Sequence, residues 1–262
     1  MFIIGELING MYLDMASAIT SHDKKAIQKC ALEQIAGGAD ALDISCGPSS
    51  NNPLIDMPWL VETIQEVTNK PLCLDSSKYQ VIQAGLNVSK NETMINSTTA
   101  DLEKLEVLVP LAKQYKSKLI GITINKNGIP RDKDQRVELA ATIIEYCQKN
   151  DFPIEDLYLD PIVLPVNVAQ GQMLEILESI REFKILSEPS PKTIIGLSNV
   201  SQGSQNHSLI NRAFLTMAVA YGLNSAILNP KDNELMDTLI TTELILNKNI
   251  YCDSYLEAYR RK

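Results

Sequence analysis

The chain has 262 residues, of which 45% are hydrophobic and 21% are charged, and its formal net charge is −8. This length suits one large α/β domain, and no apolar run approaches the roughly 18 residues needed to span a membrane. The acidic balance argues against nucleic-acid binding, which depends on Lys and Arg neutralising phosphates. We therefore expect one domain over residues 1–262, a cytoplasmic location, and neither membrane nor nucleic-acid partners.

The N-terminal stretch MFIIGELING is apolar but has no basic region and no cleavage site, so we predict a strand there. Five scattered cysteines include no CxxC pair, and the chain has only two histidines, His22 and His207. Zinc–thiolate sites and Ser-His or Cys-His catalysis are therefore not expected, and we predict no bound metal.

Short β-prone runs recur along the chain, each followed by turn residues and a segment with helical spacing. Eight strands are predicted: Phe2–Glu6, Ala41–Ser45, Leu72–Asp75, Thr93–Asn96, Leu119–Ile124, Leu157–Asp160, Thr193–Ser198 and Ser225–Asn229. Thr98-x-x-Asp101 is interpreted as a capping box, and Gly37-Gly38 as the end of the first helix. Eight such units predict a single (β/α)8 TIM barrel. A doubly wound sheet would be expected to carry a Gly-rich phosphate turn, which is absent.

The C-terminal segment is predicted to form an additional helix. Tyr251, Tyr255 and Tyr259 recur at every fourth position and make one aromatic stripe. The stripe is explained either by packing on the outside of the barrel or by a subunit interface.

Polar side chains stand at the end of almost every predicted strand, where TIM barrels carry their active sites. They are Glu6, Asn9, Asp43, Ser45, Asp75, Asn96, Asn125, Asp160, Ser198, Asn199 and Asn229. One such residue would be explained as a strand end or helix cap. Repetition around the barrel, with almost no cations, instead predicts a neutral, planar ligand rich in N–H donors. A 2-amino-4-oxo pterin fits, because one carboxylate can accept its paired donors.

Two other readings of these strand ends remain open. A carboxylate pair could catalyse glycoside hydrolysis, although such sites need sugar-stacking aromatics, and this chain has one Trp (Trp59) and 5% aromatic residues. The oxygen-rich rim could also bind a hard cation such as Mg²⁺, although its carboxylates come from strands spread around the mouth.

Six segments carry a resemblance to a known family: GELIN at 5–9, ALDISCGP at 41–48, CLDS at 73–76, MINST at 94–98, LYLDP at 157–161 and GLSNVSQ at 196–202. Together they resemble the pterin-binding methyltransferases, and in particular the methyltetrahydrofolate:corrinoid/iron-sulfur protein methyltransferases of the acetyl-CoA pathway. The resemblance extends to the closing YCDS segment at 251–254. The chain lacks the basic SRK turn of dihydropteroate synthase and the corrinoid-binding and zinc-binding motifs of methionine synthase.

This resemblance implies a homodimer that binds methyl-tetrahydrofolate and transfers its N5-methyl group to Co(I) of a corrinoid, a cobalamin-type cofactor. The corrinoid would be held by a separate protein such as a corrinoid iron-sulfur protein. By motif match, the substrate-binding residues are Glu6, Asp75, Asn96, Asp160, Gly196, Ser198, Asn199, Gln202 and His207. Leu7, Ser45 and His207 stand where the family more often has Arg, Asn and Arg. Transfer from a methylcorrinoid to tetrahydrofolate and a non-catalytic folate-binding module are the alternatives.

Breaking the bond between N5 and its methyl group requires that a proton or positive charge reach N5. We expect Asn199 to donate a hydrogen bond to N5, while Asp160 and Asp75 hold the ring, and we predict these three as catalytic residues. Arg131, Arg136 and His207 are candidate contacts for the anionic folate tail. The loops 47–53 and 125–135 are candidate docking segments for the partner.

Overall fold

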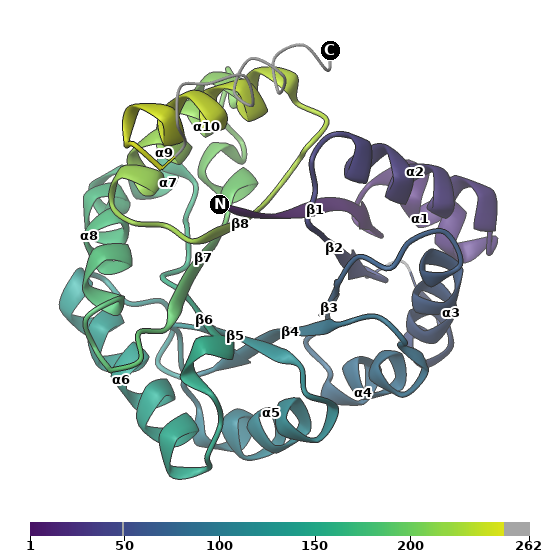
Figure 1. Ribbon diagram of the computed structural model, residues 1–262, viewed down its shortest axis with the longest axis horizontal. Coiled ribbons are helices and arrows are strands. Elements are labelled where there is room, and N and C mark those ends of the chain that lie inside the picture. Colours follow the sequence, from purple (N-terminus) through teal and green to yellow (C-terminus); the bar gives the residue numbers. More distant parts are fainter. Residues whose placement is uncertain (49, 249–262) are drawn as a thin grey trace.

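Eight parallel strands close into a barrel in chain order in the computed structural model, which describes residues 1–48 and 50–248 (Figure 1). The strands are β1 Phe2–Asn9, β2 Ala41–Ser45, β3 Leu72–Asp75, β4 Thr93–Thr99, β5 Lys118–Ile122, β6 Leu157–Asp160, β7 Lys192–Gly196 and β8 Ser225–Leu228. Strand β8 pairs with β1 and completes the ring. The predicted TIM barrel is confirmed.

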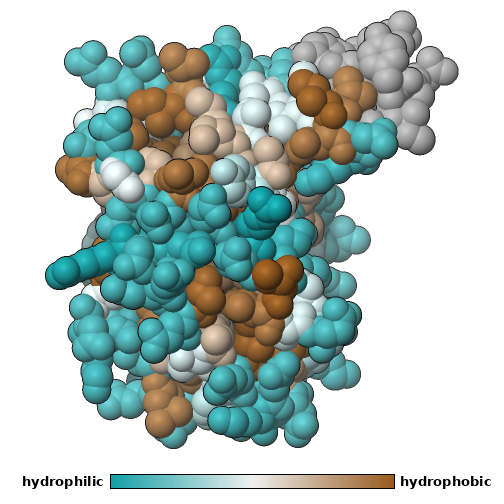
Figure 2. Space-filling model, turned by 90° about the vertical axis from the view of Figure 1, so that its left-hand side faces the viewer, coloured by the Kyte–Doolittle hydropathy of each residue, from teal (hydrophilic) through white to brown (hydrophobic). Residues whose placement is uncertain are grey.

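Helices surround the barrel on its outside (Figure 1). They are α1 Leu13–Thr20, α2 Lys24–Ala36, α3 Pro53–Gln65, α4 Tyr79–Val88, α5 Leu102–Tyr115, α6 Lys133–Lys149, α7 Val166–Ala169, α8 Met173–Phe183, α9 His207–Ala220 and α10 Asn233–Ile245, with short 3-10 turns η1 Ile154–Asp156, η2 Gln170–Gln172 and η3 Leu197–Ser201. The flank over α6 and α8 is largely polar with apolar patches between the polar groups (Figure 2). Over residues 1–48 and 50–248, no helix is long and apolar enough to cross a membrane. The predicted C-terminal helix with its three tyrosines lies outside the described residues.

The barrel interior has its own apolar cluster, with one buried residue from each of β1 to β7, and it shows which side chains of those strands point inward. It consists of the buried residues Ile4, Ala41, Cys73, Met94, Ile120, Tyr158 and Ile194. Side chains alternate along a strand, so the residue two positions further on faces the interior as well. These next inward residues, at the carboxyl ends of the strands, include Glu6, Asp43, Asp75, Asn96, Asp160 and Gly196. Alternation alone therefore brings the polar side chains together at one end of the barrel, which we call the mouth.

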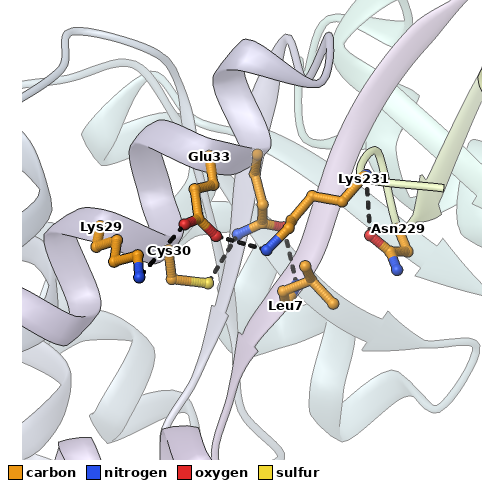
Figure 3. Close-up of polar contacts among 7 residues, drawn as sticks. Leu7, Lys29, Cys30, Glu33, Asn229 and Lys231 are labelled. Atoms are coloured by element: carbon orange, nitrogen blue, oxygen red, sulfur yellow. Dashed lines mark hydrogen bonds and ion pairs between the residues drawn. The ribbon is translucent and has the colours of Figure 1, made fainter. Parts of the chain in front are cut away.

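A polar contact outside the barrel joins its first and last units. Lys231, after β8, pairs with Glu33 of α2 at 2.5 Å, while Gln34 of the same helix accepts a hydrogen bond from the backbone N–H of Leu7 at 2.9 Å (Figure 3). Leu7 thus lies against α2, on the outer side of β1, and its side chain takes no part in the charge balance of the mouth.

Several predicted boundaries are wrong. Strands β1 and β4 run three residues further, to Asn9 and Thr99, through irregular pairing between Gly5 and Ile8 and between Asn96 and Thr98. The capping box does not form, because Thr98 is still in strand β4 and helix α5 begins only at Leu102. The other ends moved less. Gly37 ends a helix as predicted, but this helix is α2 and not the first of the chain, because α1 precedes it.

Candidate functional site at the barrel mouth

Two cavities open at the mouth and share Asn9 and Met11. The first, of about 530 Å³, is lined by six of the predicted binding residues: Glu6, Gly196, Ser198, Asn199, Gln202 and His207. The second, of about 520 Å³, includes Asp75 and the segment after β2. The structure therefore gathers most of the predicted residues around one opening.

Asp43 is the central carboxyl of the mouth. It is buried and accepts a hydrogen bond from the Asn96 amide, Nδ2 to Oδ1, at 3.0 Å. Burial, then the neighbouring carboxyl of Asp75 and to a smaller extent Glu6, raise the pKa of Asp43 to about 8, while hydrogen bonds with Asn96 and Cys73 lower it in part. Because desolvation and like charges both oppose ionisation, this carboxyl holds a proton near neutral pH when no ligand is bound.

Glu6 and Ser198 connect strand β1 to the turn after β7. Ser198 Oγ donates a hydrogen bond to Glu6 Oε1 at 2.7 Å. Burial raises the pKa of Glu6, and the Ser198 bond opposes this rise in part. The turn that carries Asn199 is thus anchored to strand β1, which is separated from β7 by β8 alone.

Asp75 and Asp160 face the interior from strands β3 and β6. Burial raises the pKa of Asp75, and a hydrogen bond with Ser45 lowers it. Burial also raises the pKa of Asp160 to about 7, even though its Oδ1 accepts a hydrogen bond from the backbone N–H of Ile162 at 2.7 Å. Neither Asp160 nor Asn96 lines the two cavities directly.

Asn199 is exposed in turn η3. Its carbonyl accepts a hydrogen bond from the backbone N–H of Gln202 at 3.2 Å, whereas its side-chain amide has no hydrogen-bond partner among the described residues. His207 begins helix α9 and lies within 3.2 Å of Ser201 Oγ through Nδ1. The amide of Asn199 is therefore available to a ligand.

Eight residues that line the first cavity were not among the predicted binding residues, and they include Asp43, Tyr12 and Asn211. Asp43 is predicted only as a strand end. Its position two residues after Ala41 on strand β2 is the local signal that its side chain also points into the barrel. Tyr12 lies at the start of helix α1, where burial, Glu6 and Asp43 raise its pKa to about 12. Asn211 lines the same cavity from α9, and its Oδ1 is buried without a hydrogen-bond partner in the described part of the chain. Nothing in the local sequence pattern distinguishes Tyr12 or Asn211.

Arg136 is not a contact for an anionic tail, which corrects the prediction. It is fully buried in helix α6 and donates hydrogen bonds to the carbonyls of Pro161 and Asp132 and to Gln172 Oε1. Its guanidinium therefore has a structural role, holding the segment after β6 against α6. Arg131 is exposed, as the tail hypothesis requires.

The two loops predicted to dock a partner differ in their relation to the mouth. Residues 47, 48, 50, 51 and 53 line the second cavity. The segment 125–135 is shorter than expected, because a bridge joins Asn125 to Gly128 and Gln135 already belongs to α6. Among residues 1–48 and 50–248, no three His, Cys, Asp or Glu side chains are grouped so that they could hold a metal ion.

Fold and site together define a TIM-barrel enzyme whose polar mouth is built from strand ends. The family model for pterin binding enzymes matches residues 14–229, and the chain belongs to this family. The resemblance seen in the strand-end motifs is thereby confirmed at the level of the family.

Two curated relatives and one solved structure illustrate the similarity. The chain is 28% identical to the methylcorrinoid:tetrahydrofolate methyltransferase of Eubacterium limosum, over 100% of this chain and 97% of that protein. It is 28% identical to methionine synthase of Mycobacterium leprae over 77% of this chain but only 18% of that protein. Dihydropteroate synthase of Stenotrophomonas maltophilia shares the fold, with a TM-score of 0.68, 15% identity, and 95% and 94% of the two chains covered.

Proposed function

We propose that the chain transfers the N5-methyl group of methyl-tetrahydrofolate to Co(I) of a corrinoid carried by a separate protein. In this proposal residues 1–262 act as one pterin-binding methyltransferase domain. The relatives that match the chain include a methionine synthase and a methylcorrinoid:tetrahydrofolate methyltransferase, and the name of the second describes methyl transfer between a corrinoid and a folate, which supports the proposal.

The observation that carries the proposal is the set of inward carboxyls and amides at the mouth. Asp43, Asp75 and Asp160 all have raised pKa values because burial opposes their ionisation. A ligand that brings paired N–H donors would compensate for this desolvation, and the amino group and ring N–H of a pterin are such donors. Asp75, Asn96 and Asp160 bind the pterin in this proposal, with Glu6, Gly196, Ser198, Gln202 and His207 around it.

Asn199 acts on N5. When the methyl group leaves, the C–N electron pair stays on N5, which must gain a proton to become the N–H of tetrahydrofolate. A hydrogen bond donated by the free amide of Asn199 stabilises the electron pair that collects on N5 as the C–N bond breaks, before N5 gains its proton, while Asp160 and Asp75 hold the ring in place. The corrinoid supplies the nucleophile, which is why the chain needs none of its own.

Transfer in the opposite direction, from a methylcorrinoid to tetrahydrofolate, is the second candidate. The Eubacterium limosum relative, which aligns over the whole chain, carries this direction in its name. The same site serves both directions, since a group that stabilises the transition state does so for the forward and the reverse reaction alike. The partner and the supply of methyl groups then decide the net direction.

The remaining parts of the proposal concern the setting of the reaction. The chain acts in the cytoplasm as a homodimer, holds no metal of its own, and receives the corrinoid from a partner such as a corrinoid iron-sulfur protein. Light scattering measures the dimer, and elemental analysis together with activity after EDTA treatment measures the metal. A stoichiometric metal that is lost together with activity would contradict the metal-free part.

The function itself is tested with the purified chain and free cobalamin. Co(I) cobalamin is mixed with an excess of methyl-tetrahydrofolate and with a smaller amount of enzyme. Formation of methylcobalamin is followed by absorbance. The reverse assay starts from methylcobalamin and tetrahydrofolate. Multiple turnovers in either assay support a methyltransferase. Tight binding of folate without transfer in either direction would contradict it and would indicate a folate-binding module.

A further inference from the structure

Gly196 ends strand β7 on the inward face and meets only one side chain outside its own neighbourhood. A Cβ atom built at this position would lie 3.0 Å from Nδ2 and 3.8 Å from Cγ of Asn199, with no other described atom within 4 Å apart from its chain neighbours. The backbone angles, φ −83° and ψ 97°, are accessible to any residue. The backbone does not require glycine here, so a different reason is needed for the missing side chain.

The backbone around Asn199 is fixed, but its side chain is not. Gln202 donates from its backbone N–H to the carbonyl of Asn199, and Ser198 is tied to Glu6 at 2.7 Å. The side-chain amide of Asn199 has no hydrogen-bond partner among the described residues. The bare backbone of Gly196 therefore lets Nδ2 come so close to strand β7 that a Cβ atom at 196 would lie only 3.0 Å from it.

We propose that Gly196 is a positioning residue for Asn199: the absent side chain lets the amide rest against the end of β7, at the depth where it meets N5 of the folate. This inference rests on the proposed function, because it assigns a purpose to the position of Asn199. A methyl group at 196 pushes the amide outward by a few tenths of an ångström or into another rotamer. A hydrogen bond made in the transition state is sensitive to such a displacement.

A methyl group at 196 has one competing effect, because Gly196 also lines the first cavity. The added carbon could touch the folate directly rather than through Asn199. The two effects separate in a double-mutant cycle. Direct contact with folate persists when Asn199 is replaced by alanine, whereas an effect transmitted through the amide vanishes.

The experiment compares Gly196→Ala, Asn199→Ala and the double variant with the wild type. Gly171→Ala is the matched control, because Gly171 is exposed outside the site and an added Cβ there meets nothing within 4 Å. Single-turnover transfer to excess Co(I) cobalamin at saturating methyl-tetrahydrofolate gives the rate, calorimetry gives the Kd, and crystal structures of the wild type and Gly196→Ala give the position of Nδ2.

Gly196→Ala is expected to lower the saturated rate by roughly 10-fold with a Kd within about threefold of wild type. It should add no further loss in the Asn199→Ala background, and Gly171→Ala should match wild type. An unmoved Nδ2, a rate within twofold of wild type, or the same loss in the Asn199→Ala background would overturn the inference. A Gly196→Ala chain that does not fold overturns it too, because the contact is with the end of a mobile side chain. Absence of transfer by the wild type overturns the proposed function instead, and the position of Nδ2 still decides the structural claim.

Discussion

Asn96 donates a hydrogen bond to Asp43 at 3.0 Å even though strand β3 lies between the strands that carry the two residues. The bond forms because alternate strands of a closed barrel contribute side chains to the same interior layer. The hydrogen bond links the ends of β2 and β4 at the mouth, and Asp75 lies on strand β3 between them. Burial and then the neighbouring carboxyl of Asp75 raise the pKa of Asp43, and a ligand that donates hydrogen bonds would favour its ionised form.

Asp160→Ala is expected to weaken folate binding by roughly 30-fold to 150-fold. The substitution removes a partly buried acceptor and leaves the pterin N–H donors unpaired, at a cost of about 2 to 3 kcal/mol. Calorimetry with methyl-tetrahydrofolate measures the loss. Asp134→Ala, whose side chain is 90% exposed, is the matched control and should bind as the wild type does. Unchanged affinity in a folded Asp160→Ala protein would show that the pterin does not contact this strand end.

Asn199→Ala should affect the rate more than the binding. An amide donor contributes little to N5 of the neutral tertiary amine and more as the electron pair of the breaking C–N bond collects on N5. We expect a loss of on the order of 10² to 10³ in the methyl-transfer step, with about 1 kcal/mol lost in binding. Single-turnover transfer to Co(I) cobalamin at saturating folate, measured from pH 5 to 8, isolates that step. A rate that stays within threefold of wild type across this range would exclude Asn199 as the group that activates N5.

Folate binding is expected to release protons near neutral pH. Burial raises the pKa of Asp160 to about 7 in the empty site. N–H donors from the pterin favour the carboxylate and lower that pKa, so the affinity should increase as the pH rises towards and through 7 and then level off. Calorimetry in two buffers with different ionisation enthalpies counts the protons. Asp160→Asn should release fewer, and proton uptake by the wild type would contradict the assignment.

Asp160→Asn should stabilise the empty barrel, and more so at high pH. Folding raises the pKa of Asp160 from near 4 in the unfolded chain to about 7. The contribution of this carboxyl to the stability of the folded state is therefore fully present only below pH 4, and it is lost as the pH rises through 7. The gain in the free energy of unfolding should therefore be greater at pH 8 than at pH 5, by roughly 2 kcal/mol. Urea unfolding at the two pH values measures it. A gain that is smaller at pH 8 would mean that burial does not destabilise this carboxylate.

The sequence by itself determined the barrel and the composition of its mouth. Strand count, the turns between strands, and the polar residue at each strand end are local properties, and parallel closure places all carboxyl ends at one opening. Asp75 and Asn96 could therefore be assigned to the mouth from their positions in the chain. The end of the first long helix at Gly37 followed from local turn chemistry as well.

Other features depended on contacts between segments that are far apart in the chain. Thr98 stays in strand β4 because its pairing with β5 continues past an irregularity, and this outweighs a local capping pattern. Arg136 carries a charge that is expected at a surface, yet its spacing of four from Ala140 puts it on the buried face of α6, where acceptors after β6 and before α8 pair its guanidinium. The raised pKa of Asp43, the cavity contact of Tyr12 and the contact between Gly196 and Asn199 likewise appeared only in the folded barrel. Local pattern fixes which way a side chain points along its own strand or helix, but its charge environment and packing come from neighbours that only closure of the barrel brings together.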